Sequence, residues 1–379
     1  MESLSLRIHQ NPELAWQERE AVSRLTAALE AEGFFIERDL CGLETAFRAS
    51  YGSAEGGPTI ALIAEYDALP EIGHACGHNL ICTAAVGAAT ALRQALAEGK
   101  LPGRIQVIGT PAEEGGGGKI LLLERGAFEG VDAALMFHPG ARTMTVRGSL
   151  AATRVTMAFR GKAAHAAANP HLGINALDAC IGTFNAVAAL RQHVKDETRI
   201  HGIITRGGAA ANIVPDYAEA KFIIRHRSQD YLRTLKDKVL DCARGAALAV
   251  GATVEFEEGL TYAERKINHT LAERFAHHLE RLGEAVKAPP PIGGVGSSDF
   301  GNVSQALPAI HPYIAMVPEG TSAHTPDFAA AAGSPAGMRA MLLAAKCLAL
   351  TAADLLGDPK FLKDVKDEFA DEFAKEQTS

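Results

Sequence analysis

The length, composition and charge of the chain narrow its class before any motif is considered. The 379 residues are enough for two domains, and 47% apolar with 22% charged residues is ordinary for a soluble globular protein. The net charge of −8 and the lack of a clustered run of Lys and Arg outside the C-terminal tail argue against nucleic-acid binding. A small-molecule substrate is therefore the expected partner.

Cysteine usage and hydropathy indicate the compartment. The six cysteines occur singly, without the spacing of a disulfide framework. The N-terminus lacks the charged start and long apolar stretch of a secretion signal, and no eighteen uncharged apolar residues run together. We therefore expect a cytoplasmic protein that does not contact a membrane.

The first part of the chain alternates between helical and strand patterns. Apolar residues at helical spacing predict a helix over residues 18–32, and a short continuous apolar run predicts a strand over 59–64 that is buried on both faces. The same order then continues as a helix over 80–96, a strand over 104–109, a helix over 119–125 and a strand over 133–137. This alternation predicts an α/β fold with a doubly wound, mostly parallel sheet.

The pattern changes after Gly148. Strands and helices then follow in the order β-α-β-β-α-β over residues 153–160, 174–191, 202–205, 218–224, 231–250 and 253–256. This order predicts a ferredoxin-like α+β domain inserted into the first one.

The first domain resumes beyond the insertion. A strand over 310–316 and a helix over 336–350 are predicted there, and the charged segment 360–379 is expected to be an exposed helix or a frayed end. The domain assignment is residues 1–149 and 262–379 for the sheet domain and 150–261 for the inserted domain.

Polar residues that bind metals follow several of the predicted strands. Ligands of open parallel sheets bind beyond the carboxyl ends of the strands. The residues found at these ends are Asp67, Cys76, His78, Glu113, Glu114, His138 and His324. Cys, His and Glu are ligands of zinc and manganese, so one convergent metal site is predicted. A lone histidine is more often a satisfied polar group or a surface residue, and we expect that role for His311. We expect His269, His277 and His278 to lie on solvated helix faces.

The adjacent carboxylates of Glu113 and Glu114 suggest a division of labour. They repel each other unless a cation lies between them or one holds a proton. One can bind a metal while its neighbour accepts a proton from a metal-bound water. A solvated acidic loop is the alternative for the pair taken alone.

The glycine run 115–118 resembles a phosphate-binding loop only superficially. Glu113 and Ile120 stand where such a loop requires Gly and Ser or Thr. We expect these glycines to let the backbone approach the site and to open the next helix.

Four motifs, taken in order, resemble the metal-dependent aminoacylase and carboxypeptidase family of amidohydrolases. They are Glu-Tyr-Asp-Ala-Leu-Pro at 65–70, His-Ala-Cys-Gly-His-Asn at 74–79, Pro-Ala-Glu-Glu-Gly-Gly at 111–116 and Gly-Lys-Ala-Ala-His-Ala at 161–166. The resemblance extends from His9 to the segment around His324. It looks closest to the branch that includes aminobenzoyl-glutamate hydrolase, auxin-conjugate hydrolases and β-alanyl-lysine type dipeptidases.

The resemblance implies a catalytic domain with two clustered divalent ions, zinc or manganese, and an inserted lid domain that mediates homodimerisation. The implied metal ligands are Cys76, His78, Glu114, His138 and His324. Glu113 would be the general base, and His165 of the lid would reach the partner subunit's site and stabilise the oxyanion. Asn212 and Arg225 would hold the backbone of the substrate and its carboxylate. For Arg225 the physical reason is bidentate hydrogen bonding to a carboxylate.

The chain departs from the family at two positions. Much of the family begins its metal site with His-x-Asp, whereas Glu65 stands here in place of the His, so we assign Asp67 a supporting role behind the ligands. Auxin-conjugate hydrolases carry a further His soon after Cys-Gly-His, but Asn79 follows here, which removes one candidate ligand.

Three function classes follow. The main hypothesis is hydrolysis of an amide bond in a dipeptide or N-acyl amino acid by metal-activated water. The alternative is a catalytically silent protein that binds peptides or amino-acid conjugates, against which the intact Glu113 and Glu114 argue. A thiol oxidoreductase is disfavoured because no cysteine lies at Cys-x-x-Cys spacing from Cys76.

Overall fold

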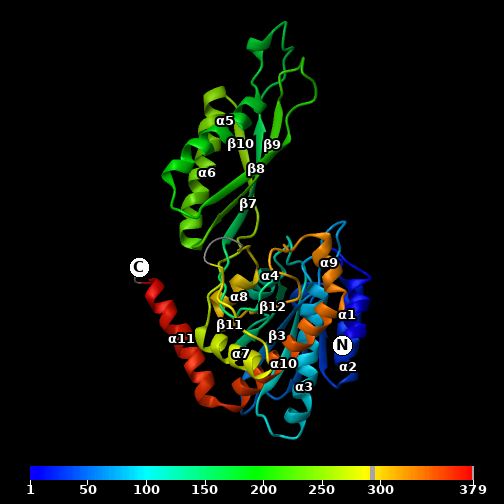
Figure 1. The fold of residues 1–379 in the computed structure, drawn as a ribbon. Helices are drawn as coiled ribbons and strands as arrows, with labels where there is room; N and C mark the ends of the chain where they lie inside the picture. Colours follow the sequence, from blue (N-terminus) through cyan, green and yellow to red (C-terminus); the bar gives the residue numbers. More distant parts are fainter. Residues whose placement is uncertain (291–294, 378–379) are drawn as a thin grey trace. The chain divides into compact units, whose positions relative to one another are not determined.

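The computed structural model describes residues 1–290 and 295–377 and divides into two compact units (Figure 1). Unit 1 comprises Met1–Gly148 and Arg265–Ser379, and unit 2 comprises Ser149–Glu264. Each unit has its own apolar core.

Unit 1 is built on a six-stranded sheet with the order β1-β2-β4-β3-β5-β11. Its strands are β1 (Phe35–Arg38), β2 (Phe47–Gly52), β3 (Thr59–Glu65), β4 (Arg104–Thr110), β5 (Ala133–Leu135) and β11 (Ala309–Ile310). The last four pair in parallel, while β1 and β2 add an antiparallel edge. Every residue of β3 is buried, as expected of a central strand covered on both faces. The mostly parallel sheet is thus confirmed.

Helices cover this sheet. They are α1 (Glu2–His9), α2 (Arg19–Ala31), α3 (His78–Ala97), α4 (Gly118–Glu124), α7 (His269–Arg281), α8 (Phe300–Ala306), α9 (Pro326–Ala332) and α10 (Pro335–Gly357). The two longest apolar helices, α3 and α10, pack against each other and against β3 (Figure 1). Both are long and apolar enough to cross a membrane, but 56% of the most apolar window of each is buried inside the protein, as in a core helix.

The predicted strand over 310–316 is wrong as a single strand. The chain forms β11, breaks at His311 and Pro312, and continues as β12 (Tyr313–Ala315). Proline has no backbone N–H to continue a ladder. After the break, β12 pairs in parallel with β6 (His138–Gly140) in a separate two-stranded sheet. This second pairing places His138 beyond the end of β5.

The C-terminal segment is not a frayed end over the residues that the structure describes. It forms α11 (Pro359–Gln377), and Phe361 and Val365, one helical turn apart, are buried. The Asn268 amide donates to the Val365 carbonyl at 2.8 Å. This helix is therefore anchored to unit 1 through an apolar stripe that the high charge of the segment conceals.

Unit 2 has the predicted β-α-β-β-α-β order. Its elements are β7 (Ala151–Arg160), α5 (Ala176–Leu190), β8 (Arg199–Arg206), β9 (Tyr217–His226), α6 (Gln229–Val250) and β10 (Thr253–Glu258). The strands form an antiparallel sheet with the order β10-β7-β9-β8, so β8 lies at an edge. Asn175 and Ser228 cap the N-termini of α5 and α6 with their side chains. Both helices pack on the sheet around Phe159 and Phe222.

Candidate metal and active site

Ligand-type side chains of unit 1 converge beyond the carboxyl ends of its parallel strands. Three groups have all their ligand atoms within 4.8 Å of one another: Cys76 with His78 and His138, Cys76 with Glu114 and His324, and His78 with Glu113 and Glu114. The structure thus brings together the five ligands implied by the resemblance and the proposed general base. These residues lie in three loops, at the start of α3 and at the start of β6.

The loop before α3 bends at Gly77. This residue has a φ of 76°, and a Cβ there would lie 2.6 Å from Cγ of Pro139, so the position requires glycine. The bend lets Cys76 and His78 converge although one residue separates them. His324, which also has a positive φ of 64°, is held by its own N–H, which donates to the Ala75 carbonyl at 2.9 Å.

Hydrogen bonds orient two of the imidazoles. His78 Nδ1 lies 2.8 Å from the Asp67 carbonyl and 3.0 Å from Asp67 Oδ1, and its Nε2 lies 3.9 Å from Glu114 Oε1. His138 Nδ1 lies 2.6 Å from the Pro139 carbonyl, and its Nε2 lies 3.4 Å from Cys76 Sγ. Metal-binding histidines are typically held in this way by the ring nitrogen that does not bind the metal. Asp67 therefore lies where a supporting residue is expected.

The charges of the cluster fit a bound cation. Burial, followed by repulsion from Glu65 and Glu114, raises the pKa of Glu113 well above its ordinary value. Burial lowers the pKa of His138 to about 4, which keeps its imidazole neutral and able to bind a metal. Burial opposes the charged form of His78, but the nearby Glu65 carboxylate outweighs it and raises the pKa of His78. Carboxylates, a thiol and imidazoles in one cluster form a donor set suited to divalent metals such as zinc.

A buried ion triad lies beside the cluster and was missed in the sequence. The Lys119 amine is completely buried, 2.7 Å from Glu65 Oε2 and 2.8 Å from Asp299 Oδ1. The other oxygen of Glu65 lies 3.3 Å from His78 Nε2, so the triad contacts the predicted ligands directly. The only signal in the sequence was position: Glu65 ends the apolar run of β3, and Lys119 follows the glycine run.

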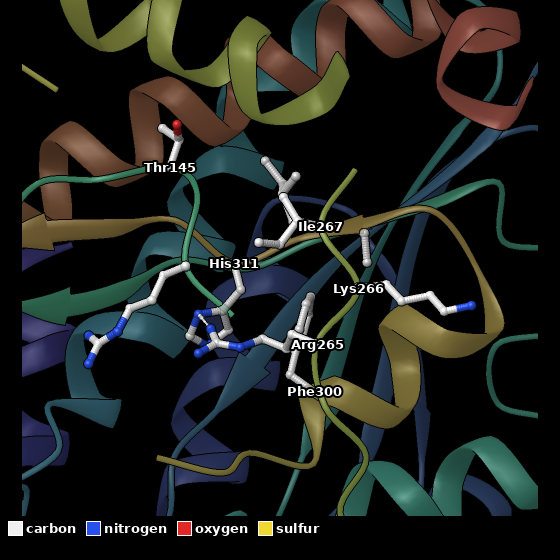
Figure 2. A pocket seen from close by; sticks show the side chains of 9 residues that line it. Thr145, Arg265, Lys266, Ile267, Phe300 and His311 are labelled. Atoms are coloured by element: carbon white, nitrogen blue, oxygen red, sulfur yellow. Dashed lines mark hydrogen bonds between the residues drawn. The ribbon is translucent and has the colours of Figure 1, made fainter. Parts of the chain in front are cut away.

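A second missed neighbour is the pair of Arg265 and His311. Figure 2 shows these side chains next to each other, while the Lys266 amine points away. Arg265 Nη1 lies 2.5 Å from His311 Nδ1, and the His311 ring is 5.5 Å from the His138 ring. Burial and the Arg265 charge lower the pKa of His311 well below its ordinary value. His311 thus packs behind a predicted metal ligand.

The residues predicted in the lid are not gathered at one place in unit 2. His165 is exposed in the loop after β7, and its Nδ1 accepts from the N–H of Ala168 at 3.1 Å. The Asn212 carbonyl accepts from the neighbouring Ala166 N–H at 3.0 Å, so Asn212 lies near His165. Arg225 on β9 pairs with Ala152 at the start of β7, the opposite end of that strand.

Comparisons with known proteins agree with this fold. Residues 61–350 match the family described as Peptidase family M20/M25/M40. A Xaa-Arg dipeptidase of Mus musculus is 43% identical over 99% of this chain and 90% of its own length. One of the p-aminobenzoyl-glutamate hydrolase chains of Escherichia coli (strain K12) is 31% identical over 96% of this chain and 90% of its own length.

A solved structure extends the comparison to the fold. The crystal structure of a Bacillus subtilis dinuclear metal binding peptidase from the M20 family superposes with a TM-score of 0.69 at 24% identity, covering 93% of this chain and 97% of that one. The family match and the two sequence identities together show that this chain belongs to peptidase family M20/M25/M40 and is a metal-dependent hydrolase of amide bonds.

Proposed function

We propose that the protein hydrolyses the amide bond of a dipeptide or N-acyl amino acid, with Glu113 as the general base. The observation that carries this proposal is the group formed by His78, Glu113 and Glu114, whose ligand atoms lie within 4.8 Å of one another. One carboxylate is thus available as a ligand and its neighbour as a base. The names of the relatives, dipeptidase and aminobenzoyl-glutamate hydrolase, support this substrate class.

Two divalent ions, zinc or manganese, would lower the pKa of a water and polarise the substrate carbonyl. Their proposed ligands are Cys76, His78, Glu114, His138 and His324. Cys76, His78 and Glu114 each belong to two of the three ligand groups, and this overlap supports one compact site for more than one ion.

Glu113 would take the proton from the attacking water and return it to the leaving amine. Its side chain is 9% exposed and lies in one ligand group with His78 and Glu114. A base held at this place can take the proton from the water and keep it until the amine leaves.

His165 would stabilise the oxyanion in the partner subunit of a homodimer. Because its Nδ1 accepts a hydrogen bond, its Nε2 carries the proton and can donate. The ten residues of β7, about 33 Å at the usual rise per residue, separate His165 from the end that leads to unit 1. This separation supports action on a second subunit.

The lid offers an edge for dimerisation. Among the described residues β8 pairs only with β9, and its Ile203 is 65% exposed. Unpaired strand edges are ready sites for pairing with another chain.

The six unpaired cysteines support a reducing compartment, and we place the protein in the cytoplasm.

The test is turnover by the metal-loaded protein on Xaa-Arg dipeptides, N-acetyl amino acids and aminobenzoyl-glutamate. Glu113→Gln should lower kcat by about 10²- to 10⁴-fold, the range of general-base catalysis, with the metal content unchanged. Glu124→Gln, at an exposed position on α4, is the matched control. Full activity of the Glu113→Gln protein would exclude the proposed base. Tight binding of these substrates without cleavage, seen by calorimetry, would instead favour a silent binding protein.

A further inference from the structure

The residue before the proposed general base has an unusual backbone conformation. Ala112 is completely buried and has a φ of 57°, in the left-handed region. This region costs a non-glycine residue roughly 1–2 kcal/mol, so it persists only where the surrounding structure holds it. Because Ala112 directly precedes Glu113, its backbone angles set the direction in which the Glu113 side chain leaves the chain.

Two buried carboxylates hold the backbone on either side of Glu113. Glu18 Oε1 accepts from the Ala112 N–H at 2.9 Å, and Asp67 Oδ2 accepts from the Glu114 N–H at 3.0 Å. Asp67 also contacts His78, so its place is tied to the metal ligands. Glu18 has no such tie: it lies at the N-cap position of α2 and belongs to none of the ligand groups.

The segment that carries Glu18 packs against the same turn. The Gly116 N–H donates to the Ala112 carbonyl at 3.0 Å, which closes the turn around Glu113. A Cβ on Gly116 would lie 2.6 Å from Trp16 Nε1, so the indole covers the turn directly. The segment therefore holds the turn at two points. Glu18 accepts a hydrogen bond from the Ala112 N–H, and the Trp16 indole contacts Gly116.

We propose that Glu18 is a positioning residue that holds Ala112 in the left-handed conformation and thereby directs Glu113 at the site. The inference rests on the proposed role of Glu113 as the base. Glu18 acts through the backbone, since its oxygen bonds to the Ala112 N–H and not to a ligand.

This role requires a hydrogen-bond acceptor on a side chain long enough to reach the Ala112 N–H. Burial, followed by repulsion from Asp67, raises the pKa of Glu18 to about 7, so an uncharged carboxyl group is readily formed at this position. A neutral amide oxygen of the same length should serve equally well. Glu18→Gln keeps this oxygen, Glu18→Asp withdraws it by one carbon, and Glu18→Ala removes it.

The experiment compares these three variants as metal-loaded enzymes. Glu18→Ala and Glu18→Asp should lower kcat by about 10- to 100-fold, because small misplacements of a catalytic group have effects of this size. KM and metal content should change less than about threefold, whereas Glu18→Gln should retain most of the kcat. Hydrogen exchange of the amides of residues 112–116 should be faster in the Ala and Asp variants, also without metal, and unchanged in the Gln variant.

Glu13→Ala is the matched control in the same segment. Its carboxylate accepts from the N–H groups of Glu20 and Ala21 at the start of α2, so its loss should lower stability without changing kcat or the exchange of residues 112–116. The inference is overturned if Glu18→Asp is as active as the wild type or if Glu18→Gln is as slow as Glu18→Asp. If the wild type cleaves no substrate, the proposed function fails, and hydrogen exchange still tests the role of Glu18.

Discussion

Removal of the Lys119 charge should destabilise unit 1 strongly. Its amine lies within 2.8 Å of Glu65 and Asp299, and all three side chains are at most 1% exposed. Lys119→Met leaves two carboxylates in the interior without their cation, and such a change typically costs about 3–5 kcal/mol. Since domains are stable by only about 5–15 kcal/mol, the loss should be a large fraction of the total. Trp16 is the single tryptophan, so its fluorescence during denaturant unfolding of the metal-free protein reports on unit 1.

A double-mutant cycle separates the ion pair from the loss of packing. The double variant Asp299→Asn with Lys119→Met should lose less unfolding free energy than the two single variants added together, by about 1–3 kcal/mol. The reason is that each single change leaves the opposite charge of the pair buried without its partner, whereas the double change removes both charges. Lys100→Met is the control, since Lys100 pairs with Glu98 at the surface and should cost less than about 1 kcal/mol. A Lys119→Met protein no less stable than this control would refute the reasoning.

Three further predictions concern the metal ligands, the lid and the N-terminal segment. Asp67→Ala should weaken metal binding by about 10- to 100-fold, measured by competition with a chelator, because His78 loses its orienting carboxylate. Ile203→Glu on the exposed edge of β8 should give monomers by light scattering if that edge pairs two chains, and an unchanged dimer would exclude the edge. Glu18 has a pKa of about 7 in the folded protein against an ordinary value of 4.5. Its contribution to the free energy of unfolding is therefore fully present below pH 4.5 and is lost as the pH rises through 7. Glu18→Gln should remove this loss and leave the metal-free protein more stable than the wild type at pH 8, by up to about 3 kcal/mol in denaturant unfolding.

The cluster of ligand-type residues could be predicted because the sequence marks the ends of parallel strands. The short continuous apolar run of β3 is typical of a strand covered on both faces, and such strands lie in the middle of parallel sheets. Polar residues that follow neighbouring parallel strands must then meet at one edge. Glu113 and His138 accordingly belong to two ligand groups that share His78, although 25 residues separate them in the sequence.

The triad could not be predicted because its partners are distant in sequence and its burial contradicts the usual behaviour of lysine. Lys119 and Asp299 are 180 residues apart, and lysine is rarely buried without a partner. His278 was missed for a similar reason: it lies on a charged helix, yet it is 3% exposed and its Nε2 is 2.8 Å from Asp354 Oδ2. In both cases the carboxylate that permits burial belongs to another element of the fold.

The triad also explains how a further carboxylate, that of Glu65, is accommodated beside the predicted ligands. A second carboxylate only 3.3 Å from His78 would add negative charge to a cluster that already holds Glu113 and Glu114. Lys119 binds one oxygen of Glu65 and leaves the other facing His78, so the added charge is balanced on the side away from the ligands. Asp299 also accepts from the backbone N–H of Lys119, which fixes the start of α4 directly after the turn that carries Glu113. Glu65, Lys119 and Asp299 are therefore expected to depend on one another, since a change in any one leaves a buried charge without its counterpart.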